Sequence, residues 1–277
     1  MRDTAAVTET HCPYCSLQCG MTLAPAGRGR VEVRPRESFP VNEGALCRKG
    51  WTATGLLGHR ERLTTPMVRD RATGEWSSAS WDQALDLVAE RLRAVQAEHG
   101  PDGVAVFGGG GLTNEKAYQL GKFARVALGT SQIDYNGRWC MSSAASASTR
   151  AFGIDRGLPF PLADVEQADV VVLVGSNLAW CHPVLFQRME RAKRQNPDMK
   201  VVVVDPRATD TSTLADLHIP LKPGTDAVLF NGLLHFLAQN GGLDTDFIAA
   251  STSGFEAALS SAAEYSLSRV AEECDVP

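Results

Sequence analysis

The sequence lacks the features that direct a chain to a membrane, to export or to nucleic acid. No apolar run approaches the length of a membrane span. The first eleven residues, MRDTAAVTETH, contain neither a hydrophobic export segment nor a twin-arginine pair, so we expect a cytoplasmic protein. The formal net charge of −5 argues against a general nucleic-acid binder. We therefore expect no nucleic acid and no membrane among its partners.

The net charge is positive in the amino-terminal part and negative in the rest of the chain. Residues 1–62 hold nine Lys/Arg against six Asp/Glu, a net charge of +3, so the other 215 residues carry −8. A basic region on an otherwise acidic chain can attract an acidic partner over a distance set by the ionic strength.

The sequence has seven cysteines, so they cannot all be paired in disulfides within the chain. An odd number in a cytoplasmic chain argues against a disulfide framework and favours ligand or reactive roles. The first four, Cys12, Cys15, Cys19 and Cys47, read C-x2-C-x3-C-x27-C. Zinc is usually bound by two separate pairs, whereas a cubane takes three thiolates from one tight loop and a fourth from elsewhere. The spacing favours a [4Fe–4S] cluster; zinc and unliganded thiols remain as alternatives.

Strand and helix patterns alternate after this region. SWDQ, from Ser80 to Gln83, predicts a capping box for an amphipathic helix that ends at Gly100–Pro101, with an apolar stripe packed in a core. ADVVVLVGSN (168–177) and KVVVVDPR (200–207) are β-branched runs typical of parallel strands covered on both faces. The alternation predicts an α/β fold with doubly wound, mostly parallel sheets.

Polar residues follow three predicted strands, where ligands of such sheets bind. The predicted cofactor-binding residues are Gly175, Ser176, Asn177, Asp205, Pro206, Arg207, Gly224 and Asp226. The alternative is that they are simply turn residues. The GGGG run at 108–111 follows another strand but lacks the GxGxxG pattern, so it is weak support for NAD.

Cys140 lies just after QIDYN, at a strand-to-loop junction. An isolated cysteine is most often a small buried hydrophobe. No histidine adjacent in sequence is placed to activate a thiol nucleophile, whereas soft ligation of a metal needs no such base. Both a buried thiol and a metal ligand therefore remain open at this position.

CPYCSLQCG and NEGALCRKGW resemble the amino-terminal Fe–S domain of the molybdopterin-guanine-dinucleotide oxidoreductases, which include nitrate reductases and formate dehydrogenases. The resemblance implies two cofactors, a [4Fe–4S] cluster and Mo-bis(molybdopterin guanine dinucleotide). It also implies that Lys49 lies on the electron path between cluster and pterin, and that Cys140 supplies a thiolate to molybdenum. The implied domains are 1–62 for the cluster, 63–137 as an α/β domain, and 138–277 as an incomplete dinucleotide-binding-like domain.

Met141 discriminates within this family, because formate dehydrogenases of this type typically have a histidine after the metal-binding residue. Cys-Met, together with GGGGLTNEKAYQLGKFAR and RGLPFPLADVEQADVVVLVGSN, resembles the cytoplasmic assimilatory nitrate reductases of bacteria. The resemblance implies nitrate as substrate and a ferredoxin, flavodoxin or NADH-linked reductase as electron donor. After GSN this chain reads LAWCHP where many members have a glutamate; the missing carboxylate affects one cofactor or packing contact that the resemblance implies, but not the class.

Family members are considerably longer, so we expect this chain to be a fragment, a truncated form or a degenerate copy. Such a chain could hold the cluster without retaining the whole molybdenum cofactor. The alternatives to nitrate reduction are formate dehydrogenation, or a non-catalytic Fe–S electron-transfer or zinc-binding module.

Overall fold

The computed structural model describes residues 7–155 and 160–277. Residues 1–6 of the MRDTAAVTETH stretch, and Arg156–Pro159 of the RGLPFPLADVEQADVVVLVGSN stretch, lie outside the described residues. The chain forms two compact units. The first comprises residues 1–14, 18–36 and 48–159, and the second comprises residues 15–17, 37–47 and 160–277. The three domains expected from the sequence stay a prediction.

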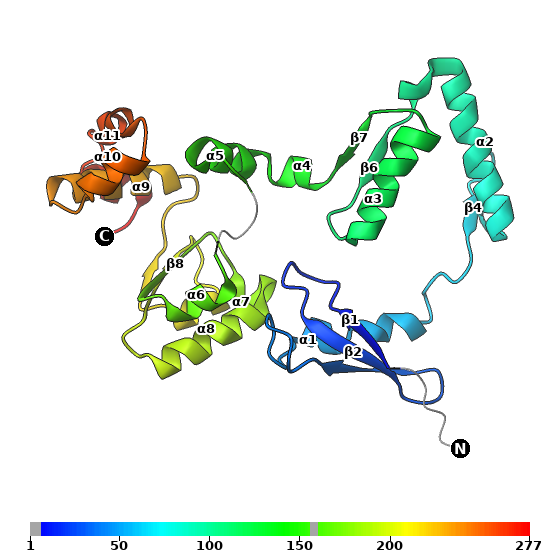
Figure 1. Cartoon of the computed structure of the whole chain (residues 1–277), viewed down its shortest axis with the longest axis horizontal. Coiled ribbons are helices and arrows are strands. Elements are labelled where there is room, and N and C mark those ends of the chain that lie inside the picture. The colour runs from blue at the N-terminus through cyan, green and yellow to red at the C-terminus, as the bar shows by residue number, and fades with distance from the viewer. Residues whose placement is uncertain (1–6, 156–159) are drawn as a thin grey trace. The chain divides into compact units, whose positions relative to one another are not determined.

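The first unit begins with a small antiparallel sheet of order β1-β2-β3, coloured blue in Figure 1. Its strands are β1 (Thr8–His11), β2 (Gly20–Pro25) and β3 (Val31–Pro35). Met21, Ala24 and Val33 are buried on this sheet. The short helix α1 (Arg48–Trp51) and the 3-10 helix η1 (Ala53–Gly58) follow.

The rest of the first unit contains two two-stranded sheets and longer helices. Strands β4 (Met67–Arg69) and β5 (Trp76–Ser78) are antiparallel, whereas β6 (Val106–Gly108) and β7 (Ile133–Tyr135) are parallel. The other elements are α2 (Trp81–His99), η2 (Pro101–Gly103), α3 (Asn114–Lys122), the π-helical η3 (Phe123–Ala127), α4 (Gly137–Cys140) and α5 (Ser142–Phe152).

The capping box predicted for α2 is confirmed, because the Ser80 hydroxyl accepts from the Gln83 amide and the Gln83 side chain accepts from the Ser80 amide. The predicted core packing of its apolar stripe is wrong for the described structure. Trp81, Leu85 and Val88 are more than half exposed. The physical reason is that the element packed most closely on α2 is the short η2, which offers too little apolar surface for a helix of 19 residues.

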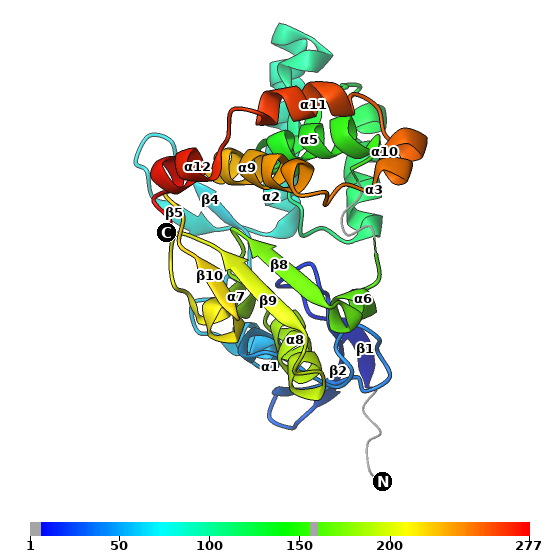
Figure 2. The same ribbon diagram turned by 90° about the vertical axis from the view of Figure 1, so that its left-hand side faces the viewer.

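The second unit is built on a three-stranded parallel sheet. Strands β8 (Val170–Val174), β9 (Lys200–Val204) and β10 (Leu217–Ile219) lie side by side in the order β10-β9-β8 (Figure 2). The remaining elements are α6 (Leu162–Gln167), α7 (Leu178–Cys181), α8 (Pro183–Gln195), η4 (Asp210–Leu214), α9 (Asp226–Gln239), α10 (Thr245–Ser251), α11 (Phe255–Ala262) and α12 (Leu267–Cys274).

Helices pack on both faces of this sheet. On one face, Val201 and Val203 of β9 pack with Leu178 of α7 and Met189 of α8. On the other face, a second cluster joins β9 and β10 to α9 and α12, with these members: Val204, Leu221, Leu229, Val270 and Cys274. Burial of these side chains is the main term that stabilises the unit. The predicted α/β class is confirmed.

The sequence predicts that both faces of the two β-branched strands are covered. This prediction is confirmed for β9 and is wrong for β8. Val201 and Val203 of β9 are fully buried, whereas Val170, Val172 and Val174 of β8 are exposed by 56%, 50% and 41%. Val172 pairs with Val202, so these valines face the side on which α9 and α12 pack. β8 is one of the two edge strands, and the cluster formed with α9 and α12 includes residues of β9 and β10 but none of β8. Among residues 7–155 and 160–277, no helix is long and apolar enough to cross a membrane.

Candidate functional site

The four clustered cysteines differ in burial. Cys12 and Cys19 are 4% exposed each, whereas Cys15 and Cys47 are half-buried. The Cys12 amide donates to the Cys19 carbonyl at 2.8 Å, which closes the loop that starts at Pro13. None of the seven cysteines is in a disulfide. All four therefore retain the thiol chemistry that soft metals prefer.

The four cysteines are divided between the units, since Cys12 and Cys19 belong to the first and Cys15 and Cys47 to the second. Within the described ranges, no group of three or more His, Cys, Asp or Glu side chains is arranged to hold a metal ion. The assignment of these four cysteines as cluster ligands thus stays a prediction. Lys49, the predicted electron-path residue, is exposed on α1, two residues after Cys47.

Cys140 lies at the carboxyl end of α4, directly after strand β7. Its amide donates to the Asn136 carbonyl at 3.1 Å, and its side chain is exposed. The alternative of a small buried hydrophobe is therefore wrong. Gly137 allows the close approach of Tyr135, because a Cβ at Gly137 would lie 2.2 Å from that ring. Met141, the next residue, is 47% exposed.

The strand ends of the first unit frame a cavity of about 430 Å³. The glycine loop after β6 and Asp134 and Tyr135 of β7 line it, and Arg125 adds a cation. The Asn136 side-chain oxygen accepts from the Gly110 amide at 2.6 Å, which holds the glycine loop in place. The cavity thus lies at the carboxyl ends of parallel strands, where ligands of α/β sheets bind.

Two of the predicted cofactor residues of the second unit have structural partners. The Asn177 side-chain oxygen accepts from Thr211, whose hydroxyl accepts in turn from the Ala179 amide. Asp205 is buried, and its carboxylate accepts from the Arg207 amide at 2.8 Å. These contacts are those of an Asx turn and a helix start, so they agree with the turn alternative for both residues. Binding by Asn177 and Asp205 stays a prediction.

The other strand-end residues lie in the turns predicted for them. Gly175 and Gly224 have φ angles of 57° and 86°, a region that L side chains rarely adopt. Gly175, Pro206, Arg207, Gly224 and Asp226 are exposed, and Ser176 is half-buried. The described structure brings these residues to the carboxyl ends of β8, β9 and β10, as expected for one sheet edge.

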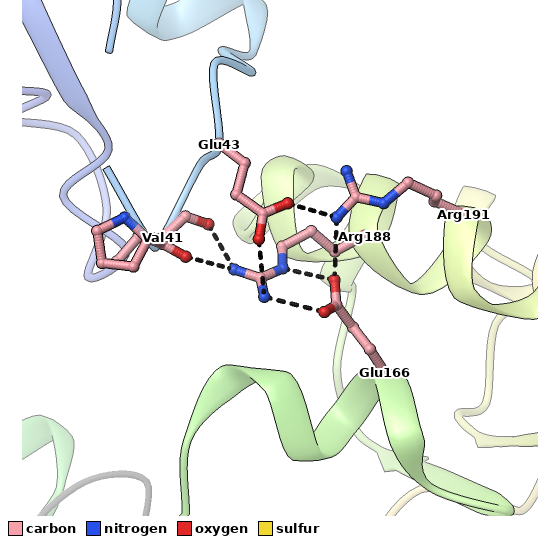
Figure 3. A network of polar contacts seen from close by, with 6 residues as sticks. Val41, Glu43, Glu166, Arg188 and Arg191 are labelled. Atoms are coloured by element: carbon pink, nitrogen blue, oxygen red, sulfur yellow. Dashed lines mark hydrogen bonds and ion pairs between the residues drawn. The ribbon is translucent and has the colours of Figure 1, made fainter. Parts of the chain in front are cut away.

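Sequence reasoning missed a buried arginine in the second unit. Arg188 of α8 is 5% exposed and forms a bidentate pair with Glu166, at 2.7 and 3.0 Å (Figure 3). The Arg188 hydrogen bond lowers the pKa of the Glu166 carboxyl and raises the pKa of the guanidinium in return. Arg191, one turn along α8, pairs with Glu43 and Glu166.

No local pattern marks this network, because 148 residues separate Arg188 from Pro40 and Arg191 from Glu43. The only signal is the pair of arginines on one helix face, at positions i and i+3. A second missed contact joins Ser16 to His182, whose Oγ and Nε2 atoms are 3.0 Å apart.

Comparison with known proteins adds to this geometry. Residues 5–57 match the model described as molybdopterin oxidoreductase Fe4S4 domain, and residues 62–266 match the one described as molybdopterin oxidoreductase. The structure of acetylene hydratase from Pelobacter acetylenicus is similar, with a TM-score of 0.78 and 25% identity. That likeness covers 97% of this chain and 37% of the hydratase chain.

Curated relatives are similar along nearly the whole chain. The assimilatory nitrate reductase catalytic subunit of Bacillus subtilis (strain 168) is 40% identical over 273 residues, which are 97% of this chain and 38% of the relative. A nitrate reductase of Klebsiella oxytoca is 43% identical, over 98% of this chain and 30% of the relative. The F420-dependent formate dehydrogenase 2 subunit alpha of Methanococcus maripaludis is 34% identical, over 98% and 39%.

The chain thus spans between 30% and 39% of the length of these relatives. The Fe4S4 match favours a cluster over zinc for the amino-terminal cysteines. The comparisons support the expected cofactors, a [4Fe–4S] cluster and Mo-bis(molybdopterin guanine dinucleotide). Because the molybdopterin oxidoreductase match over residues 62–266 covers most of the chain, the chain belongs to the molybdopterin oxidoreductase family.

Proposed function

We propose that the chain is the amino-terminal part of a cytoplasmic molybdenum nitrate reductase. The observation that carries the proposal is Cys140–Met141, an exposed thiol followed by a non-basic side chain at the end of α4. Formate oxidation has to remove a proton or hydride from the substrate, and Met141 has no group that accepts one. Reduction of nitrate to nitrite and water consumes two electrons and two protons and needs no base at that position.

The residues present fit the two cofactors chemically. Four thiols in the predicted ligand set, two of them buried, are the donors that an iron–sulfur cluster takes. Cys140 is exposed, so its thiolate is open to a metal from outside the helix. When bound, the cluster supplies single electrons and the molybdenum cofactor supplies two-electron oxygen-atom transfer. The chain's own share is to hold these groups and to exclude other ligands.

In this proposal, Cys12, Cys15, Cys19 and Cys47 hold the cluster. Lys49 provides a cation beside the fourth cysteine, and Cys140 provides the molybdenum thiolate. Gly175, Ser176, Asn177, Asp205, Pro206, Arg207, Gly224 and Asp226 contribute to one dinucleotide site at the edge of the parallel sheet. The exposed glycines there leave the backbone open to a phosphate.

The test compares Cys140→Ser with Cys181→Ser in the full-length protein, because both cysteines are exposed. Reduced methyl viologen supplies electrons, and nitrite production is measured. We expect Cys140→Ser to abolish nitrite production and Cys181→Ser to retain it. Nitrite production by Cys140→Ser at the rate of the unmutated protein would contradict the ligand assignment.

Formate dehydrogenation is the second candidate, favoured by the 34% identity to the Methanococcus maripaludis subunit. The viologen assay decides between nitrate reduction and formate dehydrogenation when it is run a second time with formate as substrate and oxidised viologen as electron acceptor. Formate-dependent viologen reduction without nitrate-dependent viologen oxidation would favour formate dehydrogenation.

A non-catalytic module is the third candidate. One zinc per chain without visible colour would support it.

The physiological donor is a ferredoxin, a flavodoxin or an NADH-linked reductase in this proposal. The net charge of +3 on residues 1–62 would attract an acidic donor. Donor oxidation should therefore slow as ionic strength rises, because salt screens exposed charges. A rate that does not change with salt would rule out such steering.

A further inference from the structure

Helix α8 holds two separate amino-terminal segments within the second unit. These segments are residues 15–17, which include Cys15, and residues 37–47, which end at Cys47. The amino-terminal end of α8 contacts the first segment, and its middle contacts the second. One rigid element therefore holds a cysteine from the tight loop and the distant fourth cysteine.

Arg188 makes the strongest of these contacts. Its Nη1 donates to the carbonyls of Pro40 and Val41, both at 2.9 Å, while Nε and Nη2 bind the Glu166 carboxylate (Figure 3). Four of its five donors are thus used within the second unit. A buried guanidinium with this many partners fixes the backbone that it binds, because each lost bond would leave a desolvated donor.

Glu43 adds a second tie to the same loop. Its carboxylate accepts from Arg191 at 2.7 Å and lies 3.7 Å from Arg188. Its φ angle of 45° is unusual for a residue with a side chain, and such a conformation persists where surrounding contacts hold it. The buried Asn42 side chain donates to the Ala45 carbonyl at 2.8 Å, which tightens the turn before Cys47.

The first segment is held at the start of α8. Ser16, next to Cys15, lies with its hydroxyl 3.0 Å from Nε2 of His182. His182 is the residue that precedes the first turn of α8, and Pro183 begins the helix. The helix itself is anchored on the sheet by Met189, which packs with Val201 and Val203 and has no exposed surface.

We propose that α8 positions Cys15 and Cys47 for the iron–sulfur cluster, with Arg188 as the main positioning residue. The inference rests on the proposed cluster ligation by these cysteines. Outer contacts that orient metal ligands commonly change metal affinity about 10- to 100-fold when removed. Arg188 would therefore act through the loop at residues 40–43 and not through contact with the cluster.

The test uses the full chain after anaerobic cluster reconstitution. The variants are Arg188→Met, Arg188→Lys and Glu43→Ala, and the matched control is Lys193→Met. Lys193 is on the same helix and pairs with Asp216 at 2.5 Å, but it contacts neither cysteine segment in the hydrogen bonds and ion pairs of the described residues. Iron per chain, the rate of iron release to a chelator, and the EPR signal of the reduced cluster are measured.

We expect iron release from Arg188→Met to be about tenfold faster than from the unmutated chain. The rate of iron release from Arg188→Lys should lie between these two rates, because lysine keeps the charge and loses the planar fork. Both Arg188 variants should alter the EPR signal, and Lys193→Met should leave release and signal unchanged. Glu43→Ala tests the loop at an exposed side chain, where unfolding of the core is not a concern.

The inference is overturned if Arg188→Lys and Glu43→Ala release iron at the unmutated rate and show its EPR signal. An equal acceleration of iron release by Lys193→Met would also overturn the inference. Iron release would then respond to any weakening of α8 and not to the loop contacts of Arg188. An unmutated chain that takes up no iron would instead contradict the cluster ligation itself. About four irons in the unmutated chain, with no difference among the variants, would remove only the role of α8.

Discussion

The two parallel sheets of this protein differ in how much of the surrounding helix surface they bury. In the second unit, β9 lies between helices on both faces, and Val201, Val203 and Met189 have no exposed surface. In the first unit, β6 and β7 form a sheet of two short strands, and α2 has no buried residue. Both regions have capped helices with apolar residues, so the surface that packs against a helix, and not its local sequence, makes the difference.

The largest effect should come from truncating a core side chain in the second unit. Met189→Ala should lower the free energy of unfolding by about 2–5 kcal/mol, because it removes buried atoms and leaves a cavity between α8 and β9. Leu85→Ala on α2 is the comparison, and its effect should stay within about 0.5 kcal/mol because this side chain is 58% exposed. Urea denaturation measures both. A large loss for Leu85→Ala would show that α2 is packed after all.

A glycine in a helix from each unit sharpens the comparison. A Cβ at Gly232 of α9 would lie 2.3 Å from Val270, so Gly232→Ala should cost about 1–3 kcal/mol through overpacking. A Cβ at Gly121 of α3 would meet only the Arg125 side-chain tip, at 3.3 Å. Gly121→Ala should therefore stabilise the chain by up to about 1 kcal/mol. Thermal unfolding followed by circular dichroism should show a lower melting temperature for Gly232→Ala and a higher one for Gly121→Ala.

The helix caps should behave alike in the two units. Ser80 caps α2 and Ser266 caps α12, each by accepting from the amide three residues on. Alanine at either position should cost about 1 kcal/mol, because capping depends on the local backbone. Hydrogen exchange of the first-turn amides measures the loss in each helix. Unequal losses would mean that packing around α12 contributes to the cap.

The smallest effect is confined to acid pH. Arg188 lowers the pKa of Glu166 below its ordinary value of 4.5, so the folded pKa lies under the unfolded one. The resulting stabilisation is complete above the unfolded pKa and is lost as the pH falls through the folded pKa. Unfolding of Glu166→Gln between pH 7 and 3 should lack this part of the acid dependence. An acid limb identical to that of the unmutated chain would contradict the direction of this pKa shift.

The sequence by itself determined local features whose causes lie within a few residues. The Ser80–Gln83 capping box, the Thr113 cap of α3 and the strand–helix order follow from side-chain and backbone chemistry at short range. The cysteine spacing favoured an iron–sulfur cluster, because ligand spacing in a tight loop is itself a local property, and the resemblance of CPYCSLQCG and NEGALCRKGW indicated the family that the matches show.

Only the tertiary structure decided which surfaces are covered and which distant residues meet. The stripe of α2 and the valines of β8 have the same pattern as buried elements, yet they are exposed, because exposure depends on which distant elements pack against them. The contacts of Arg188 with Glu166 and with the loop before Cys47 join segments far apart in the chain. A local pattern cannot encode such a meeting, because the free energy of a buried ion pair depends on burial and geometry that exist only after folding.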